Sequence, residues 1–105
     1  MLKTFLTNAF SINMLPGRET EVDFYPLTTE EAHDILVSGF ESAIGHKDTA
    51  AVVSQILGIK VSVNRVDVKL NPDVQIIVAQ YTGPRLPEGV TTLPDGAKIE
   101  FWQVI

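Results

Sequence analysis

Gly45-His46 is the pair of residues with the strongest local case for chemistry in this sequence. The pair lies just before an expected helix, where free backbone N–H groups and the positive end of the helix dipole meet the imidazole. That arrangement suits a phosphate group, and histidine gives or takes a proton near neutral pH. The alternative is a histidine that serves only as a helix cap or a surface group, and the sequence leaves it open.

Further polar residues stand at the ends of apolar segments and are candidates for ligand contacts: Asn8, Ser11, Asn13, Asn64, Arg65, Gln80, Arg85 and Glu88. Each has a structural alternative. The polar residues at positions 8–13 can bond the backbone of their own turn. Arg65 and Gln80 can be satisfied groups at the edge of the core. Arg85 and Glu88 can form a loop ion pair of little energetic consequence.

Several common kinds of site do not fit this sequence. It has no cysteine, and His33 and His46 are thirteen positions apart, so no metal-ligand cluster is predicted. No serine stands in the G-x-S-x-G setting of a hydrolase nucleophile. The seven glycines are scattered, which excludes the glycine patterns that bind ATP or NAD. We therefore expect no metal and no cofactor, and we expect His33 to be solvated on the polar side of a helix.

Alternating and apolar segments predict the strands that would position these residues. We expect strands over 2–8, 21–25, 61–70, 74–81 and 98–104, the second of them ending before Pro26. The segment 74–81 is apolar on both faces, as is typical of a central strand covered on both sides. Within 61–70 the apolar positions change parity at Asn64-Arg65, which indicates a bulge there or a polar residue on the valine face.

Two helices are expected between these strands. The segment 28–31 has a capping-box pattern, which starts a helix that ends at about Gly39. A second helix has Asp48 or Thr49 as its start signal and Gly58 as its C-terminal stop. The fold class expected is α/β (α+β): one domain that spans all 105 residues, with a mixed sheet of about five strands flanked by helices.

The overall charge limits the partners. Eight Lys+Arg against thirteen Asp+Glu give a formal net charge of -5, which argues against a surface for duplex DNA or an anionic membrane. Polar residues interrupt the first twelve positions, which match neither a signal peptide nor a spanning helix. The lack of cysteine suits a reducing cytosol. The sequence therefore predicts a soluble, cytoplasmic protein in which an anionic ligand needs a local pocket.

Six short motifs spread over nearly the whole chain carry a resemblance to a known family. They are Asn8-Ala9-Phe10-Ser11-Ile12-Asn13-Met14-Leu15, Ile44-Gly45-His46-Lys47-Asp48-Thr49-Ala50, Asn64-Arg65-Val66, Val78-Ala79-Gln80, Arg85-Leu86-Pro87-Glu88-Gly89 and Ile99-Glu100-Phe101-Trp102. In this combination and order, the chain resembles the viral ring nucleases, the type III anti-CRISPR family. No motif position departs from the family pattern.

The resemblance implies a homodimeric α/β protein that binds cyclic tetra-adenylate, the second messenger of type III CRISPR defence. It implies cleavage without metal to linear di-adenylate with 2′,3′-cyclic phosphate ends, in the cytoplasm of the host cell. By similarity, His46 is the general acid, Glu88 positions or tunes it, and Arg85 engages a phosphate at the catalytic centre. The implied substrate contacts are Asn8, Ser11, Asn13, Arg65, Gln80 and Gly45.

A different class of function uses the same fold without turnover. The chain would then hold the cyclic nucleotide as a sponge, or act as an accessory module that binds DNA or protein. The net charge of -5 weakens the DNA alternative. Conversion of cyclic tetra-adenylate to linear products over many turnovers separates the enzyme from the sponge.

Overall fold

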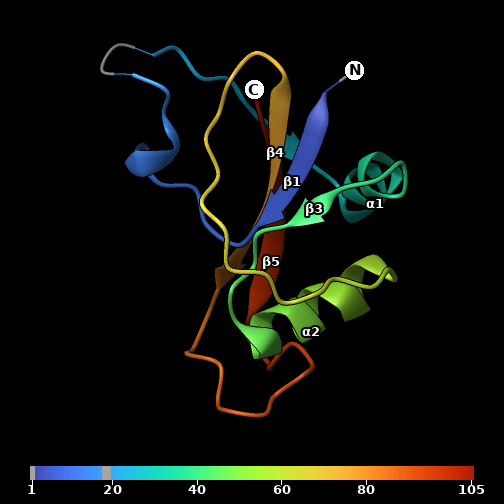
Figure 1. Cartoon of the computed structure of the whole chain (residues 1–105). Helices are drawn as coiled ribbons and strands as arrows, with labels where there is room; N and C mark the ends of the chain where they lie inside the picture. Colours follow the sequence, from blue (N-terminus) through green and yellow to red (C-terminus); the bar gives the residue numbers. More distant parts are fainter. Residues whose placement is uncertain (1, 18–19) are drawn as a thin grey trace.

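The structure, a computed structural model, describes residues 2–17 and 20–105. Its centre is one mixed sheet with the strand order β2-β5-β4-β1-β3 (Figure 1). The elements are β1 (Lys3–Thr7), a 3-10 turn η1 (Ile12–Met14), β2 (Phe24–Leu27), α1 (Thr29–Leu36), β3 (Glu41–Ser42), α2 (Lys47–Leu57), β4 (Val74–Thr82) and β5 (Lys98–Val104). β1 runs parallel to β3 and β4, whereas β5 runs antiparallel to β2 and β4. The expected α+β fold with five strands is confirmed.

β4 is the central strand, as its apolar pattern predicted. Ile77 and Ala79 point to one face, where they join a core cluster with side chains of α1 and α2. Ile76 and Val78 point to the other face and join a second cluster with residues from irregular segments. All four side chains are buried, and each large one contributes about 1.5–3 kcal/mol to folding. The sheet is therefore covered on both sides, by helices on one and by loops on the other.

β2 differs from the expected strand over 21–25, because it begins at Phe24 and continues through Pro26. Asp23 and Ile105 exchange both backbone hydrogen bonds, at 2.9 and 3.1 Å. Antiparallel pairing alternates, so Pro26, opposite Trp102, occupies a position whose nitrogen points away from β5. Since β2 is an edge strand, no ladder bond is lost there, and the proline does not end the strand.

The expected strand over 61–70 is wrong, because none of its residues is in a strand. Val61, Val68 and Leu70 are buried, whereas Val63 and Val66 remain exposed. Its backbone makes isolated hydrogen bonds to other segments, from Asn64 N–H to Ile44 O at 2.8 Å and from Leu70 N–H to Met14 O at 2.7 Å. The change of parity therefore marks an irregular segment that inserts side chains into the core at intervals. The fifth strand is instead β3, whose two residues are too few to show an alternation.

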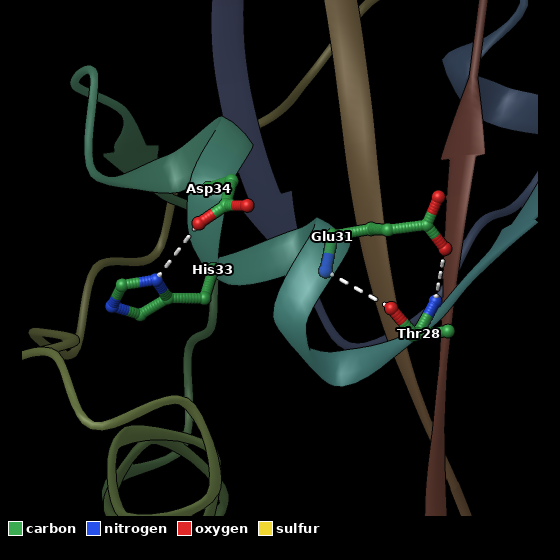
Figure 2. A network of polar contacts seen from close by, with 4 residues as sticks. All are labelled: Thr28, Glu31, His33 and Asp34. Carbon is green, nitrogen blue, oxygen red and sulfur yellow. Dashed lines mark hydrogen bonds and ion pairs between the residues drawn. The ribbon is translucent and has the colours of Figure 1, made fainter.

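The start of α1 agrees with the capping-box pattern. Thr28 N–H donates to Glu31 Oε1 at 2.9 Å, and Glu31 N–H donates to Thr28 Oγ1 at 3.1 Å (Figure 2). The helix ends at Leu36, three residues before the expected Gly39. His33 lies on the outer side of the helix, partly exposed, with its Nδ1 3.4 Å from Asp34 Oδ1 (Figure 2). It is therefore in contact with solvent, as expected.

α2 begins before its expected start signals, Asp48 and Thr49. His46 is its N-cap, so Asp48 is the second helical residue and not the cap. The helix ends at Leu57, and Gly58 follows in the left-handed conformation, at φ 71°, that a C-terminal glycine stop requires. Among the helices of the described chain, none is long and apolar enough to cross a membrane.

Candidate functional site

His46 lies in a cavity of about 430 Å³ that joins two distant parts of the chain. One wall is the first turn of α2, and the other is the loop between β4 and β5. The lining residues are His46, Lys47, Asp48, Arg85, Leu86, Pro87 and Glu88. The three residues assigned to catalysis by resemblance, His46, Arg85 and Glu88, thus share one cavity although about forty positions separate them.

The imidazole of His46 is free of the capping role that the sequence left open. Its backbone is extended, at φ -125° and ψ 126°, and its carbonyl accepts the N–H of Ala50 at 3.0 Å. The side chain makes no capping hydrogen bond and is exposed to the cavity. Free N–H groups of the first helical turn lie beside it. An anion in the cavity would therefore meet both these N–H groups and a group that can donate a proton.

The loop over 83–97 presents Arg85 and Glu88. Tyr81 Oη donates to Pro84 O at the start of the loop, and Gly89 N–H donates to Asp48 Oδ2 at 2.9 Å. Both Arg85 and Glu88 are exposed, and no ion pair joins them in the described part of the chain. The alternative of a loop ion pair is therefore not what the structure shows.

Arg65 is anchored directly beside the cavity. Its Nε donates to Gly45 O at 3.1 Å, and the two residues line a neighbouring hollow with Ala43, Val66 and Asp67. A Cβ at Gly45 would lie 2.7 Å from Arg65 Cγ, so the glycine permits this close approach. The sequence analysis did not predict that Gly45 is needed for close packing against Arg65. Asn64, the other residue at the parity change, donates its side-chain N–H to Ser42 O at 2.7 Å and is a structural group.

The remaining residues of the predicted substrate pocket lie outside the His46 cavity. Ser11 and Asn13 line a hollow with Met14, Val66, Asp67, Val68 and Lys69, and two of these residues also border Arg65. Ser11 precedes η1 without a side-chain capping bond, and Lys69 Nζ donates to Asn13 O. Asn8 directly follows β1 and is partly buried. The structure thus places Ser11, Asn13 and Arg65 in adjoining hollows that are distinct from the His46 cavity.

Gln80 lies on another part of the surface, in an apolar groove with Phe10, Phe24, Val78 and Trp102. Its Nε2 donates to Tyr81 O at 3.1 Å. Glu100 is opposite Gln80 on β5, and the pKa of its carboxyl is lowered by a hydrogen bond and the positive charge of Lys98, whose Nζ is 2.7 Å from Glu100 Oε1. Gln80 therefore lies beside Tyr81 O and opposite Glu100, and it does not line the cavity that contains His46.

Asp48 is the residue of this site whose structural role the sequence analysis did not predict. It was expected only as a start signal, whereas the structure buries it and bonds its carboxylate to the loop. Its spacing of four from the buried Val52 puts both on one face of α2, and this spacing is the signal that could have predicted its burial. In residues 2–17 and 20–105, no group of three or more His, Asp or Glu side chains is arranged to hold a metal ion.

Comparisons with known proteins found a matching family model, a similar viral protein and a similar solved structure. The family model described as STIV B116-like matches residues 4–101. Uncharacterized protein 26 of Sulfolobus islandicus filamentous virus (isolate Iceland/Hveragerdi) is 30% identical over 86 residues, which is 81% of this chain and 72% of that protein. The solved structure of B116 of Sulfolobus turreted icosahedral virus is 34% identical, covers 97% of both chains and superposes with a TM-score of 0.81.

Proposed function

The chain belongs to the STIV B116-like family, with relatives in Sulfolobus viruses, and on that premise we propose that it is a metal-independent ring nuclease. Its substrate is cyclic tetra-adenylate, and its products are linear di-adenylates with 2′,3′-cyclic phosphate ends. Cleavage in the cytoplasm of an infected cell would switch off type III CRISPR signalling. The observation that carries the proposal is the gathering of His46, Arg85 and Glu88 in one cavity at the start of α2.

The proposed reaction needs only the residue types found there. The ribose 2′-OH attacks the adjacent 3′-phosphate, so that an O2′–P bond forms and the P–O5′ bond breaks. The imidazolium of His46 gives its proton to the departing O5′, and the proton of the 2′-OH passes to solvent. Arg85 stabilises the negative charge on the phosphoryl oxygens. Glu88, which lines the same cavity, would position the imidazole for this transfer.

Substrate binding in this proposal uses the surface next to the cavity. Arg65, fixed against Gly45 O, supplies a second positive charge near His46. Ser11 and Asn13 extend the contacts from the adjoining hollow. Asn8 and Gln80, which lie outside both hollows, supply further polar groups by resemblance. Since the chain carries a net charge of -5, such local groups are what allow it to attract an anion.

The proposal includes a homodimer. A ring of four nucleotides is large for one cavity of about 430 Å³, and a two-fold axis would match the symmetry of the ring. Two copies would present two histidines, one for each of the two cuts that give di-adenylate. Light scattering at micromolar concentration should give twice the 11.5 kDa of the chain, and a monomer with full activity would contradict this part of the proposal.

The central experiment incubates the purified protein with a large excess of cyclic tetra-adenylate, with and without chelator, and analyses the products by mass spectrometry. We expect many turnovers, the same rate in chelator, and products with 5′-hydroxyl and 2′,3′-cyclic phosphate ends. A ring whose ribose 2′-OH groups are replaced by hydrogen should bind and stay intact, because it lacks the internal nucleophile.

Each other outcome excludes a part of the proposal. Products with 5′-phosphate ends, or loss of activity in chelator, would indicate attack by a metal-activated water. Tight binding of the intact ring without turnover would identify a sponge. Failure to bind cyclic tetra-adenylate would exclude both and leave the accessory-module alternative.

A further inference from the structure

Asp48 is a charged side chain in a buried position. Only 4% of it is exposed, and it is the one ionisable residue in the buried class among residues 2–17 and 20–105. Burial of a carboxylate is unfavourable unless the charge is compensated by hydrogen bonds or opposite charge. Asp48 is the second residue of α2, and the partial positive charge at the start of the helix supplies part of this compensation.

The carboxylate also makes a specific bond to a distant part of the chain. Asp48 Oδ2 accepts the N–H of Gly89 at 2.9 Å, across 41 positions of sequence. Gly89 has a φ of 83°, a conformation that favours glycine, so the turn that presents this N–H depends on the residue type. Both partners are thus fitted to the contact, one by burial and one by backbone conformation.

The loop over 83–97 has few other restraints. Its remaining hydrogen bonds are local ones, from Tyr81 Oη to Pro84 O, from Val90 N–H to Pro87 O, and from Ala97 N–H to Pro94 O. In the described part of the chain, the Asp48–Gly89 bond is the only hydrogen bond that joins this loop to an element outside its own β4–β5 hairpin. The position of the loop relative to α2 therefore depends strongly on Asp48.

From this geometry we infer that Asp48 is a positioning residue of the cavity, which holds the loop that carries Arg85 and Glu88 against the imidazole of His46. The bond lies two residues from His46 on one side and one residue from Glu88 on the other, so it fixes both walls close to the proposed reacting atoms. Asp48 itself transfers no proton. The inference rests on the proposed function, since it assigns a role to Asp48 in that reaction.

The first experiment compares Asp48→Ala and Asp48→Asn in single-turnover cleavage of cyclic tetra-adenylate at saturating protein. Asp48→Ala removes the acceptor, and the rate should fall about 10–100-fold, as small misplacements of reacting groups do. Its affinity for the ring should fall by a smaller factor, because Arg65 and the helix N–H groups remain. Asp48→Asn keeps an amide oxygen that accepts the Gly89 N–H, and its rate should stay within about threefold of the original.

Glu30→Ala is the matched control. Glu30 is also an acid at the second position of a helix, in α1, but it is exposed, and in residues 2–17 and 20–105 no side-chain hydrogen bond or ion pair joins it to the loop. It should cleave at the original rate. Equal losses in Asp48→Ala and Glu30→Ala would reduce the role of Asp48 to helix stability. A loss in Asp48→Asn as large as that in Asp48→Ala would show that charge matters and the hydrogen bond does not, and either result overturns the inference.

A second measurement needs neither substrate nor a variant. Hydrogen exchange followed by NMR in the unmodified protein should show the Gly89 amide exchanging at least tenfold more slowly than that of Thr91, an exposed residue of the same loop. Equal exchange at the two amides would exclude the contact even if Asp48→Ala failed to fold. If the protein does not cleave the ring, the proposed function is wrong, and the exchange data still decide whether Asp48 holds the loop.

Discussion

The two faces of the sheet are covered in different ways. On one face α1 and α2 pack Ala32, Leu36 and Val53 against the strands, in regular helical turns (Figure 1). On the other face the cover consists of irregular segments that insert Val68 and Leu70 between stretches of exposed chain. The helical layer is held by backbone hydrogen bonds within each helix. The irregular layer is held by isolated hydrogen bonds between residues far apart in the sequence.

The difference has a parallel in the candidate site. His46 stands at the start of α2, as the residue that caps the helix. The irregular segments carry Ser11, Asn13 and Arg65. Isolated hydrogen bonds join these segments to others, at Arg65 Nε to Gly45 O and at Lys69 Nζ to Asn13 O. Sites built on helices and strands are held more accurately than sites on loops. We therefore expect proton transfer to depend on the helical side, and ligand affinity to depend on the irregular side.

The largest effect expected from this comparison is that of His46→Ala. Removal of the general acid should lower the cleavage rate about 10²–10⁴-fold, while the affinity for cyclic tetra-adenylate changes little. Single-turnover kinetics and a binding titration on the same protein measure the two quantities. An unchanged rate would mean that the helical side does not supply the proton.

A second prediction compares the two covers in stability. Leu57 on the helical side and Leu70 on the irregular side are 4% and 5% exposed, so their truncations remove the same atoms from equally buried positions. Each Leu→Ala change should cost about 2–5 kcal/mol in free energy of unfolding, with Leu57→Ala nearer the upper value because a helix collapses less readily into a cavity. Urea denaturation measures both, and a larger cost for Leu70→Ala would reverse the comparison.

A third prediction concerns binding on the irregular side. Arg65→Ala removes a charged donor to phosphate, so the affinity for the ring should fall about 10–100-fold and become less dependent on salt, with the saturated rate within about threefold of the original. Isothermal titration at two salt concentrations tests this. A loss of rate without a loss of affinity would place Arg65 with His46 instead.

Gly45→Ala sharpens the same prediction without removal of a charge. The new Cβ would lie 2.7 Å from Arg65 Cγ, so the arginine must move, and the affinity should fall in the same direction. Gly17→Ala is the control, since a Cβ at that position meets no atom within 4 Å in the described part of the chain beyond its own neighbours.

The smallest effect is expected at Lys98, the first residue of β5. Lys98→Ala removes the hydrogen bond and charge that lower the pKa of Glu100, so this pKa should rise toward its ordinary value when measured by NMR titration. The paired carboxylate is favoured at pH values above its unfolded pKa, and the benefit is lost as the pH falls through its folded pKa. Because the pair is exposed, we expect no change in cleavage, and a reduced rate would extend the site to this end of β5.

Local signals in the sequence were sufficient for most of the fold. The apolar pattern of β4, the capping box at Thr28 and the stop at Gly58 act within a few residues and predicted their elements. β3 could not be predicted, because two residues carry no periodicity. Pro26 could not be placed either, because its acceptance depends on β2 being at the edge of the sheet.

The site was less accessible to sequence reasoning. The dipole argument pointed to His46, but its meeting with Arg85 and Glu88 depends on the path of the loop after β4. The separation of Ser11 and Asn13 from that cavity depends on how two irregular segments pack together. Such contacts join residues far apart in the chain, and no local pattern encodes them.

The two edges of the sheet have a consequence for aggregation. An exposed strand edge offers unpaired backbone groups to other chains, and long flat edges promote growth into fibrils. Here one edge is β2, where Pro26 turns a nitrogen without hydrogen toward solvent, and the other is β3, which is only two residues long. Neither edge presents a continuous row of donors and acceptors to an incoming strand. Pairing of sheet edges from two copies of the chain is therefore disfavoured at both edges.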